Sequence, residues 1–187
     1  MNIYKKWQNS DISEGKRLFA LVMGALIFPV SIPAILIFLL PQVDKIFGIE
    51  SFFVGFVNII MGVIAIIIGG FLALWTIIAQ IKLASGTPFP MLPTKKLIIV
   101  GPFKYCRNPM TLGTIIAYSG VVILIGSYMA LFVIIIFSLM LIVYLKLLEE
   151  KELEMRFGQE YLEYKKNTPF ILPMNIVKVE KAHKYEK

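Results

Sequence analysis

Four runs of apolar residues follow one another along the chain, and short polar segments separate them. Residues 18–40 carry no charge and exceed the ~20 residues that a helix needs to cross a bilayer. Residues 51–82 form a second run, in which Lys82 at the end is the only charge. Residues 110–126 and 128–146 form two shorter runs separated by a Gly-Ser step, which is typical of a tight helical hairpin. The pattern predicts an all-α, polytopic membrane protein with four transmembrane helices.

The runs differ in length and in proline content, and each difference leads to an expectation. Pro29 and Pro33 predict a kink in the first helix, because proline lacks the N–H that a helix needs. The run 51–82 is longer than one bilayer thickness, so its helix tilts, projects beyond the membrane or breaks near Gly69 and Gly70. A break would create a fifth span, which we keep as the alternative to four. The third and fourth runs are short, and we expect that pair to stand nearly upright or to thin the membrane locally.

The polar segments complete a single integral membrane domain, residues 1–187. Residues 83–109 begin with closely spaced prolines, which remove hydrogen-bond donors and fix the backbone, so we expect a loop. Residues 147–173 mix acidic and apolar side chains and predict amphipathic helices that leave the membrane, with a break at Gly158. Residues 174–187 form a Lys-rich tail that we expect to be loosely ordered.

Composition and charge indicate a membrane protein rather than a soluble or nucleic-acid-binding one. The apolar share is 58%, whereas a soluble domain has roughly 45–50%. The net charge of +7 comes from basic residues in loops and tails, where they contact anionic lipid headgroups, and we expect no nucleic-acid binding. Positive-inside reasoning places both termini and the loop 83–109 on the cytoplasmic side. The start of the chain does not resemble a removable signal peptide.

Single cysteine and histidine residues limit the metal and redox chemistry. With only Cys106 and His183, one chain can assemble neither a disulfide framework nor a Cys/His zinc site, so we expect no metal. Cys106 lies beside Arg107, which can lower the pKa of a thiol. A lone cysteine at a membrane edge is more often a small apolar filler, and we assign it no catalysis.

Glycines in the second run suggest close helix packing. Gly55, Gly62, Gly69 and Gly70 lie on or near a seven-residue spacing, which lets a second helix approach closely. The spacing indicates either packing within the chain or a dimer face. The oligomeric state stays open.

The segment with the most chemistry comprises residues 95–111, which we call the cassette. It is polar, is interrupted by Gly101, Pro102 and Pro109, and lies directly against the third apolar run. Irregular backbone and charge at the edge of the hydrocarbon are tolerated only where they are buried in protein or line a wet cavity. The cassette is therefore predicted to form part of a ligand site.

Two adjacent carboxylates follow the fourth apolar run. Glu149 and Glu150 lie at a membrane boundary, where a carboxylate is costly unless it is hydrated or hydrogen-bonded. Glu149 can accept hydrogen bonds from paired ribose hydroxyls or attract a cationic ligand centre. Alternatively, both residues simply begin an exposed amphipathic helix, where acidic side chains stabilise the helix by interacting with its dipole. The residues alone leave both alternatives open.

Taken together, these motifs resemble a known family. They are Gly101-Pro102-Phe103-Lys104-Tyr105, Arg107-Asn108-Pro109-Met110, Leu112-Gly113, Glu149-Glu150, and the sequence from Phe157 to Lys166. In this combination they resemble the isoprenylcysteine carboxyl methyltransferase family and its phospholipid methyltransferase relatives. The resemblance covers roughly residues 86–173, and the N-terminal half is similar only in being apolar.

The resemblance implies a cofactor and the residues that bind it. In that family S-adenosylmethionine lies in a pocket at the cytosolic membrane face, closed by the C-terminal helices, and a lipophilic methyl acceptor arrives from the lipid. Asn108 stands where the family often has His, and Thr111 where it often has Tyr. The implied cofactor contacts are Lys95, Lys96, Leu97, Ile98, Phe103, Asn108, Pro109, Met110, Thr111 and Glu149.

At the position that binds the methyl acceptor, the sequence differs from that of the isoprenylcysteine methyltransferases. Four residues before Glu149, where those enzymes place an Arg that holds the substrate carboxylate, this chain has Leu145. Lys146 lies beside it but is rotated by about 100° on a regular helix. An isoprenylcysteine-like carboxylate, a lipid amine and a small amphipathic acid or alcohol therefore all remain candidate acceptors.

The implied mechanism is direct, in-line methyl transfer without a covalent protein intermediate. An amine acceptor must lose a proton, and the candidates for assisting are Glu150, Tyr105 and, among the cassette residues, Arg107. Two other functions remain as alternatives. One is a membrane reductase that resembles the sterol reductases and binds NADPH, and the other is a non-enzymatic membrane scaffold.

Overall fold

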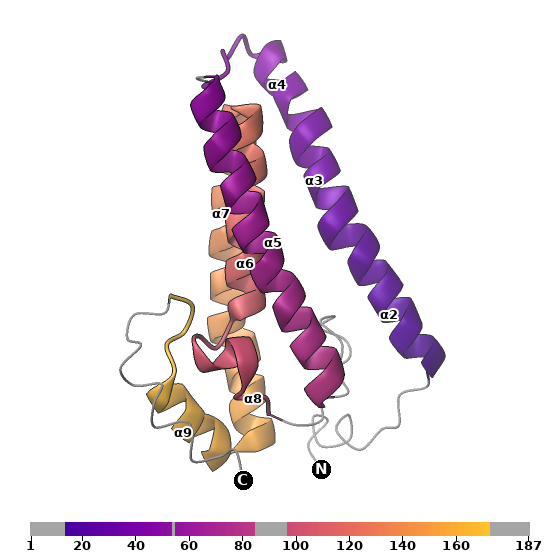
Figure 1. Cartoon of the computed structure of the whole chain (residues 1–187), viewed down its shortest axis with the longest axis vertical. Helices are drawn as coiled ribbons and strands as arrows, with labels where there is room; N and C mark the ends of the chain where they lie inside the picture. Colours follow the sequence, from indigo (N-terminus) through magenta and orange to yellow (C-terminus); the bar gives the residue numbers. More distant parts are fainter. Residues whose placement is uncertain (1–13, 54, 85–96, 173–187) are drawn as a thin grey trace.

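The computed structural model describes residues 14–53, 55–84 and 97–172, and every regular element in these ranges is a helix. The first helix comprises α2 (Glu14–Leu26), η1 (Ile27–Ser31), α3 (Ile32–Ala34), η2 (Ile35–Leu39) and α4 (Leu40–Ile46). It is followed by α5 (Phe56–Ala84), the short turn η3 (Gly101–Lys104) and α6 (Pro109–Ile125). The last helices are α7 (Tyr128–Tyr144), η4 (Leu145–Glu149), α8 (Glu150–Phe157) and α9 (Gln159–Asn167). Figure 1 shows η3, α8 and α9 at one end of the long helices and α4 at the other.

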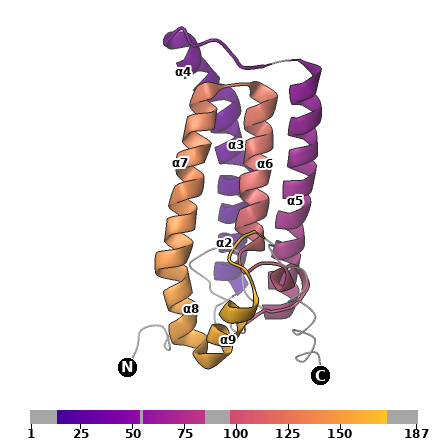
Figure 2. The same ribbon diagram turned by 90° about the vertical axis from the view of Figure 1, so that its left-hand side faces the viewer.

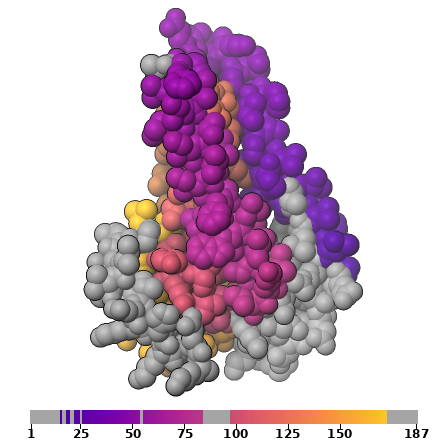
Figure 3. Space-filling view, viewed as in Figure 1, coloured from indigo at the N-terminus to yellow at the C-terminus, as the bar shows by residue number. Residues whose placement is uncertain are grey.

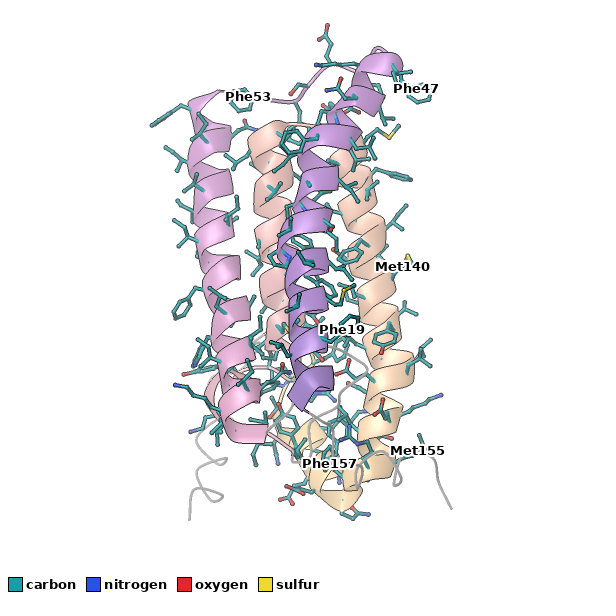
Figure 4. The ribbon with its side chains drawn as sticks, turned by 90° about the vertical axis from the view of Figure 1, so that its right-hand side faces the viewer. Phe19, Phe47, Phe53, Met140, Met155 and Phe157 are labelled. Atoms are coloured by element: carbon teal, nitrogen blue, oxygen red, sulfur yellow. The ribbon has the colours of Figure 1, made fainter. Side chains whose placement is uncertain are left out.

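The apolar helices agree with the predicted all-helical membrane architecture. Three stretches are long and apolar enough to cross a membrane, namely Val22–Ile46, Phe56–Leu83 and Tyr128–Phe157. The shorter apolar helix Pro109–Ile125 lies among them (Figure 2). Figure 4 shows Phe47 and Met140 pointing away from the helices, and both are exposed, as a surface that contacts lipid requires.

The first helix extends beyond the predicted residues 18–40 and reaches Ile46. Pro29 lies in the wide π-type turn η1, whose altered hydrogen bonding accommodates a residue without an N–H. Past residue 40 the helix continues because Asp44 is buried against the start of α7. Its carboxylate accepts hydrogen bonds from the Ser127 hydroxyl and from the Met129 N–H. The partners are distant in sequence, so the polar segment after residue 40 looked like a loop.

The second helix is unbroken. α5 passes through Gly69 and Gly70 without interruption, so the described residues contain no fifth span. It packs along α6, which runs antiparallel to it (Figure 2). At these glycines the backbones of α5 and α6 are too close for side chains to fit between them. A Cβ on Gly113 would meet the Ala73 backbone nitrogen at 2.7 Å, and one on Gly69 would meet the Ala117 nitrogen.

Packing within the chain therefore accounts for Gly62 and Gly69, whereas a Cβ on Gly55, at φ 79°, would meet nothing within 4 Å. Gly62 lies against Gly120 in the same way that Gly69 lies against Gly113. Gly70, next to Gly69, faces open space. Close approach of two backbones is the usual role of small residues in membrane helices, because it maximises van der Waals contact where lipid offers no hydrophobic driving force.

The fourth helix is also longer than predicted. Gly126, at φ 70°, and Ser127 form the expected hairpin turn, and the Ser127 side chain accepts from the Ala130 N–H at 3.1 Å. After Tyr144 the helix continues through η4 and α8, so the predicted boundary at residue 146 lies inside one 30-residue helix, Tyr128–Phe157. Gly158, at φ 57°, breaks it as predicted, and α9 follows.

We predict that Gly69→Ala and Gly113→Ala each lower the thermal unfolding temperature of the detergent-solubilised protein. The added methyl groups would meet backbone atoms, and overpacking of this kind costs about 1–3 kcal/mol. Gly70→Ala is the matched control, because it lies on the same helix and adds its methyl group in open space. Equal effects at Gly69 and Gly70 would contradict the packing.

Candidate functional site

The site candidate lies at the end of the molecule where the cassette, η4, α8 and α9 come together (Figures 1 and 2). The described part of the cassette packs against α5, and Figure 3 shows it at the surface beside the lower part of that helix. Lys95 and Lys96 lie outside the described residues. The rest of the cassette, residues 97–111, is described and enters α6 directly.

Glycine and proline shape the cassette locally. Gly101 has φ 63°, which favours glycine, and it begins the tight turn η3 with Pro102 buried. Pro109 occupies the first turn of α6, where its missing N–H costs nothing. Asn108 sits at the N-cap position, but its side chain makes no capping bond. The Asn108 amide is therefore free for another partner.

That partner belongs to the C-terminal segment, which lies over the cassette. Asn108 Nδ2 donates to the Phe170 carbonyl at 3.0 Å, and the Arg107 N–H donates to the Pro169 carbonyl at 2.9 Å. On α9, the Tyr164 hydroxyl donates to the Phe103 carbonyl at 2.8 Å. Three hydrogen bonds thus attach residues 164–170 to the cassette.

A buried ion cluster adds to these bonds. The Arg107 Nη1 lies 2.7 Å from Glu150 Oε1, and Lys165 Nζ lies 2.7 Å from Glu150 Oε2. The side chains of Arg107 and Glu150 are only 9% and 7% exposed. Lys165 also contacts Glu154 at 2.7 Å, and its hydrogen bonds to Glu150 and Glu154 raise its pKa. Glu150 thus has a protein cation next to each of its two oxygens.

Two tyrosines of α9 lie beside the cluster. Burial raises the pKa of Tyr161, and the negative charge of Glu150 adds to this effect. Burial also raises the pKa of Tyr164 well above its usual range. Both phenols are therefore neutral at physiological pH, so they act here as hydrogen-bonding and packing groups.

Glu149 differs from its neighbour. It is partly buried, and its carboxylate forms no ion pair or hydrogen bond with any residue in the described ranges. The charges that act on it are those of Glu152, Glu150 and Arg156. Arg156 is itself engaged, with Nη1 3.3 Å from Glu152 Oε1. Of the two adjacent carboxylates, Glu149 is the one whose oxygens pair with no cation among the described residues, so they can accept hydrogen bonds from a ligand.

The other predicted residues occupy varied positions around the site. Ile98 and Pro109 are buried, whereas Leu97, Phe103, Met110 and Thr111 are partly buried. Leu145 is buried, while the exposed Lys146 places its ammonium 5.9 Å from the centre of the Phe170 ring. Tyr105 is 46% exposed, and its ring lies 6.2 Å from that of Trp75.

Sequence reasoning did not identify the residues that hold the site together. Lys165, Pro169 and Phe170 lie in a segment read only as amphipathic helix and helix end. The segment has alternating acidic, aromatic and basic residues that are typical of any exposed helix. Its hydrogen bonds to the cassette bridge more than 60 positions in sequence, as Asn108 and Phe170 do with a separation of 62.

Comparison with known proteins identifies the family. The family model for phospholipid methyltransferase matches residues 57–160, more than half of the chain, from α5 to the start of α9. This chain belongs to the phospholipid methyltransferase family. Searches of curated proteins and of solved structures found no match.

Family membership sets the general chemistry. Phospholipid methyltransferases are membrane methyltransferases that use S-adenosylmethionine, and the family implies a lipid methyl acceptor. The chain is accordingly a multi-pass integral membrane methyltransferase. The match supports the phospholipid methyltransferase relatives and does not reach the isoprenylcysteine branch. In the described ranges no three His, Cys, Asp or Glu side chains are grouped to hold a metal ion.

For this methyltransferase we predict that Cys106 is chemically inert in the folded state. The side chain is buried, and burial raises the pKa of its thiol to about 11, so the reactive thiolate is scarce at neutral pH. Iodoacetamide at pH 8 should modify the denatured protein and leave the folded protein unmodified, as measured by mass spectrometry. Rapid modification of the folded protein would contradict the burial of this thiol.

Proposed function

We propose that this methyltransferase binds S-adenosylmethionine between the start of α6 and Glu149, and transfers its methyl group to a lipid-soluble acceptor. The observation that carries the proposal is the contrast between two adjacent carboxylates. Glu150 is held by Arg107 and Lys165, whereas Glu149 has no partner in the described ranges. A carboxylate at a membrane boundary is costly without a partner, and a bound ligand supplies one.

The residues present are compatible with an adenosyl cofactor. A carboxylate accepts hydrogen bonds from paired ribose hydroxyls and attracts a cationic sulfonium or ammonium. Asn108 uses its amide nitrogen on Phe170, which leaves its side-chain oxygen as an acceptor. The first turn of α6 also presents backbone N–H groups at Met110 and Thr111, because a helix start leaves its first donors without helical partners.

When bound, the cofactor supplies a methyl group that its sulfonium already makes electrophilic. The protein therefore contributes mainly by alignment of donor and acceptor, which can supply several kcal/mol. Arg107 and Glu150 neutralise each other, and Tyr105 is half exposed, so we assign none of the three as a general base. The acceptor's own lone pair attacks the methyl carbon, and the acceptor's proton, where it has one, leaves to water at the membrane surface.

The residue at the position expected to bind the methyl acceptor favours a lipid acceptor that has no carboxylate. Leu145 is buried where the isoprenylcysteine enzymes place their Arg, so no cation replaces that Arg at this position. We propose a lipid amine or another membrane-soluble nucleophile as the acceptor. The excess of basic residues near this end supports a cytoplasmic location of the site.

We predict that the detergent-purified protein binds S-adenosylhomocysteine saturably and that Glu149→Gln weakens this binding by roughly 10–100-fold. A hydrogen bond to a charged group is worth about 1.5–3 kcal/mol, which corresponds to that range. Isothermal titration calorimetry measures the affinity, and thermal unfolding should show little change because Glu149 bonds to no described residue.

Glu160→Gln on the exposed side of α9 is the control, since it removes the same charge away from the site. A well-folded wild-type protein that fails to bind S-adenosylhomocysteine would reject the proposal. Binding of NADPH in its place would support the reductase alternative.

A further inference from the structure

The buried pair of Arg107 and Glu150 joins the two segments that flank the proposed cofactor site. Arg107 directly precedes Asn108 in the cassette, and Glu150 directly follows Glu149 on the fourth helix. Their side chains meet at 2.7 Å between Nη1 and Oε1. Each proposed ligand residue is therefore the sequence neighbour of one partner of the same ion pair. We propose that this pair is a positioning device that sets the separation between Asn108 and Glu149, an inference that rests on the proposed function.

The cassette side of the pair is held firmly. The Arg107 N–H donates to the Pro169 carbonyl, and its guanidinium lies 5.5 Å from the centre of the Phe170 ring. Asn108 donates to the carbonyl of the same phenylalanine. Two consecutive cassette residues are thus attached to two consecutive residues of the C-terminal segment. The Arg107 guanidinium would lose its contact with the Phe170 ring if it turned away from this position.

The helical side is held equally well. Glu150 closes the wide turn η4, because its N–H donates to the Leu145 carbonyl. Its second carboxylate oxygen is held by Lys165. Because the Glu150 backbone is fixed in this turn, the contact of its Oε1 with Arg107 sets the direction in which the preceding residue, Glu149, leaves the helix. The ion pair is thus a short connection between the cassette and the fourth helix.

Stability alone does not require a charged pair here. The desolvation cost of a buried ion pair offsets much of its attraction, and apolar replacements of both partners are often as stable. What an apolar pair cannot supply is the attraction between opposite charges that holds these two side chains at 2.7 Å. Loss of the pair should therefore appear in ligand affinity even where the fold is retained.

The test compares ligand affinity with stability in one set of variants. Arg107→Met together with Glu150→Leu removes the pair without leaving a buried charge. Arg107→Met alone removes the connection but leaves Glu150 paired with Lys165. Lys165→Met is the matched control, because it detaches Glu150 from α9 and keeps the Arg107 contact. S-adenosylhomocysteine is titrated by calorimetry into each protein, and thermal unfolding is recorded in parallel.

The double variant is expected to unfold near the wild-type temperature and to bind S-adenosylhomocysteine at least tenfold more weakly. Arg107→Met should show a similar loss of affinity, and Lys165→Met a change of less than threefold. Arg107→Lys is a rescue variant. The contact to Glu150 is through a single nitrogen, which an ammonium can replace, so its affinity should return to within threefold of wild type.

Two results would overturn the inference. In the first, the double variant binds as tightly as the wild type, which would make the pair merely structural. In the second, Lys165→Met weakens binding as much as Arg107→Met, which would assign the effect to the docking of α9. If the double variant does not fold, the comparison of Arg107→Met with Arg107→Lys decides the question. Failure of the proposed function looks different, since the wild-type protein itself then does not bind S-adenosylhomocysteine.

Discussion

A carboxylate that leaves bulk water at a membrane boundary must find hydrogen-bond donors inside the protein, and three acidic residues of this chain are placed by that constraint. At one end, Asp44 accepts from Ser127 and from the start of α7, which ties the first helix to the fourth. At the other end, Glu150 meets Arg107 and Lys165 and ties the fourth helix to the cassette and α9. Glu149 lacks such donors in the described part of the chain. The same rule that explains two structural contacts thus supports the proposal that Glu149 binds a ligand.

The close contact between α5 and α6 determines where the cassette lies. Because Gly62 and Gly69 let the backbones of these helices approach, the end of α5 and the start of α6 are brought together. The described part of the cassette turns tightly at Gly101, beside Trp75 of α5. Proline at the start of α6 then directs Asn108 toward the C-terminal segment. Packing in the hydrocarbon therefore fixes the geometry of polar residues at its edge.

The sequence predicted the helices well, because apolar run length and breakers such as Gly126 and Gly158 act locally. It misjudged the ends of the first and fourth helices, where the deciding factors are distant partners or the lack of any breaker. In the site, the resemblance gave Asn108 and Glu149 as candidates, and their roles remain predictions. The partners of Arg107 and Glu150 could not be predicted from the sequence, because a contact such as that between Arg107 and Pro169 depends on how α9 folds back after Gly158. No local pattern encodes that return.

The different surroundings of the two adjacent glutamates follow from the wide turn that contains them. In a regular helix the N–H of Glu150 would bond to the residue four positions earlier, whereas here it bonds to Leu145, five positions earlier. The extra residue in the turn lets Leu145 and Glu150 both face inward, and both are buried. A regular helix from Leu145 onward would rotate the following side chains by up to about 100°, the step of one residue, and would separate Glu150 from Arg107. π-type turns are rare in helices, and they occur often at functional sites. In this chain the turn places one carboxylate against Arg107 and Lys165, while its neighbour is the residue for which we propose a ligand.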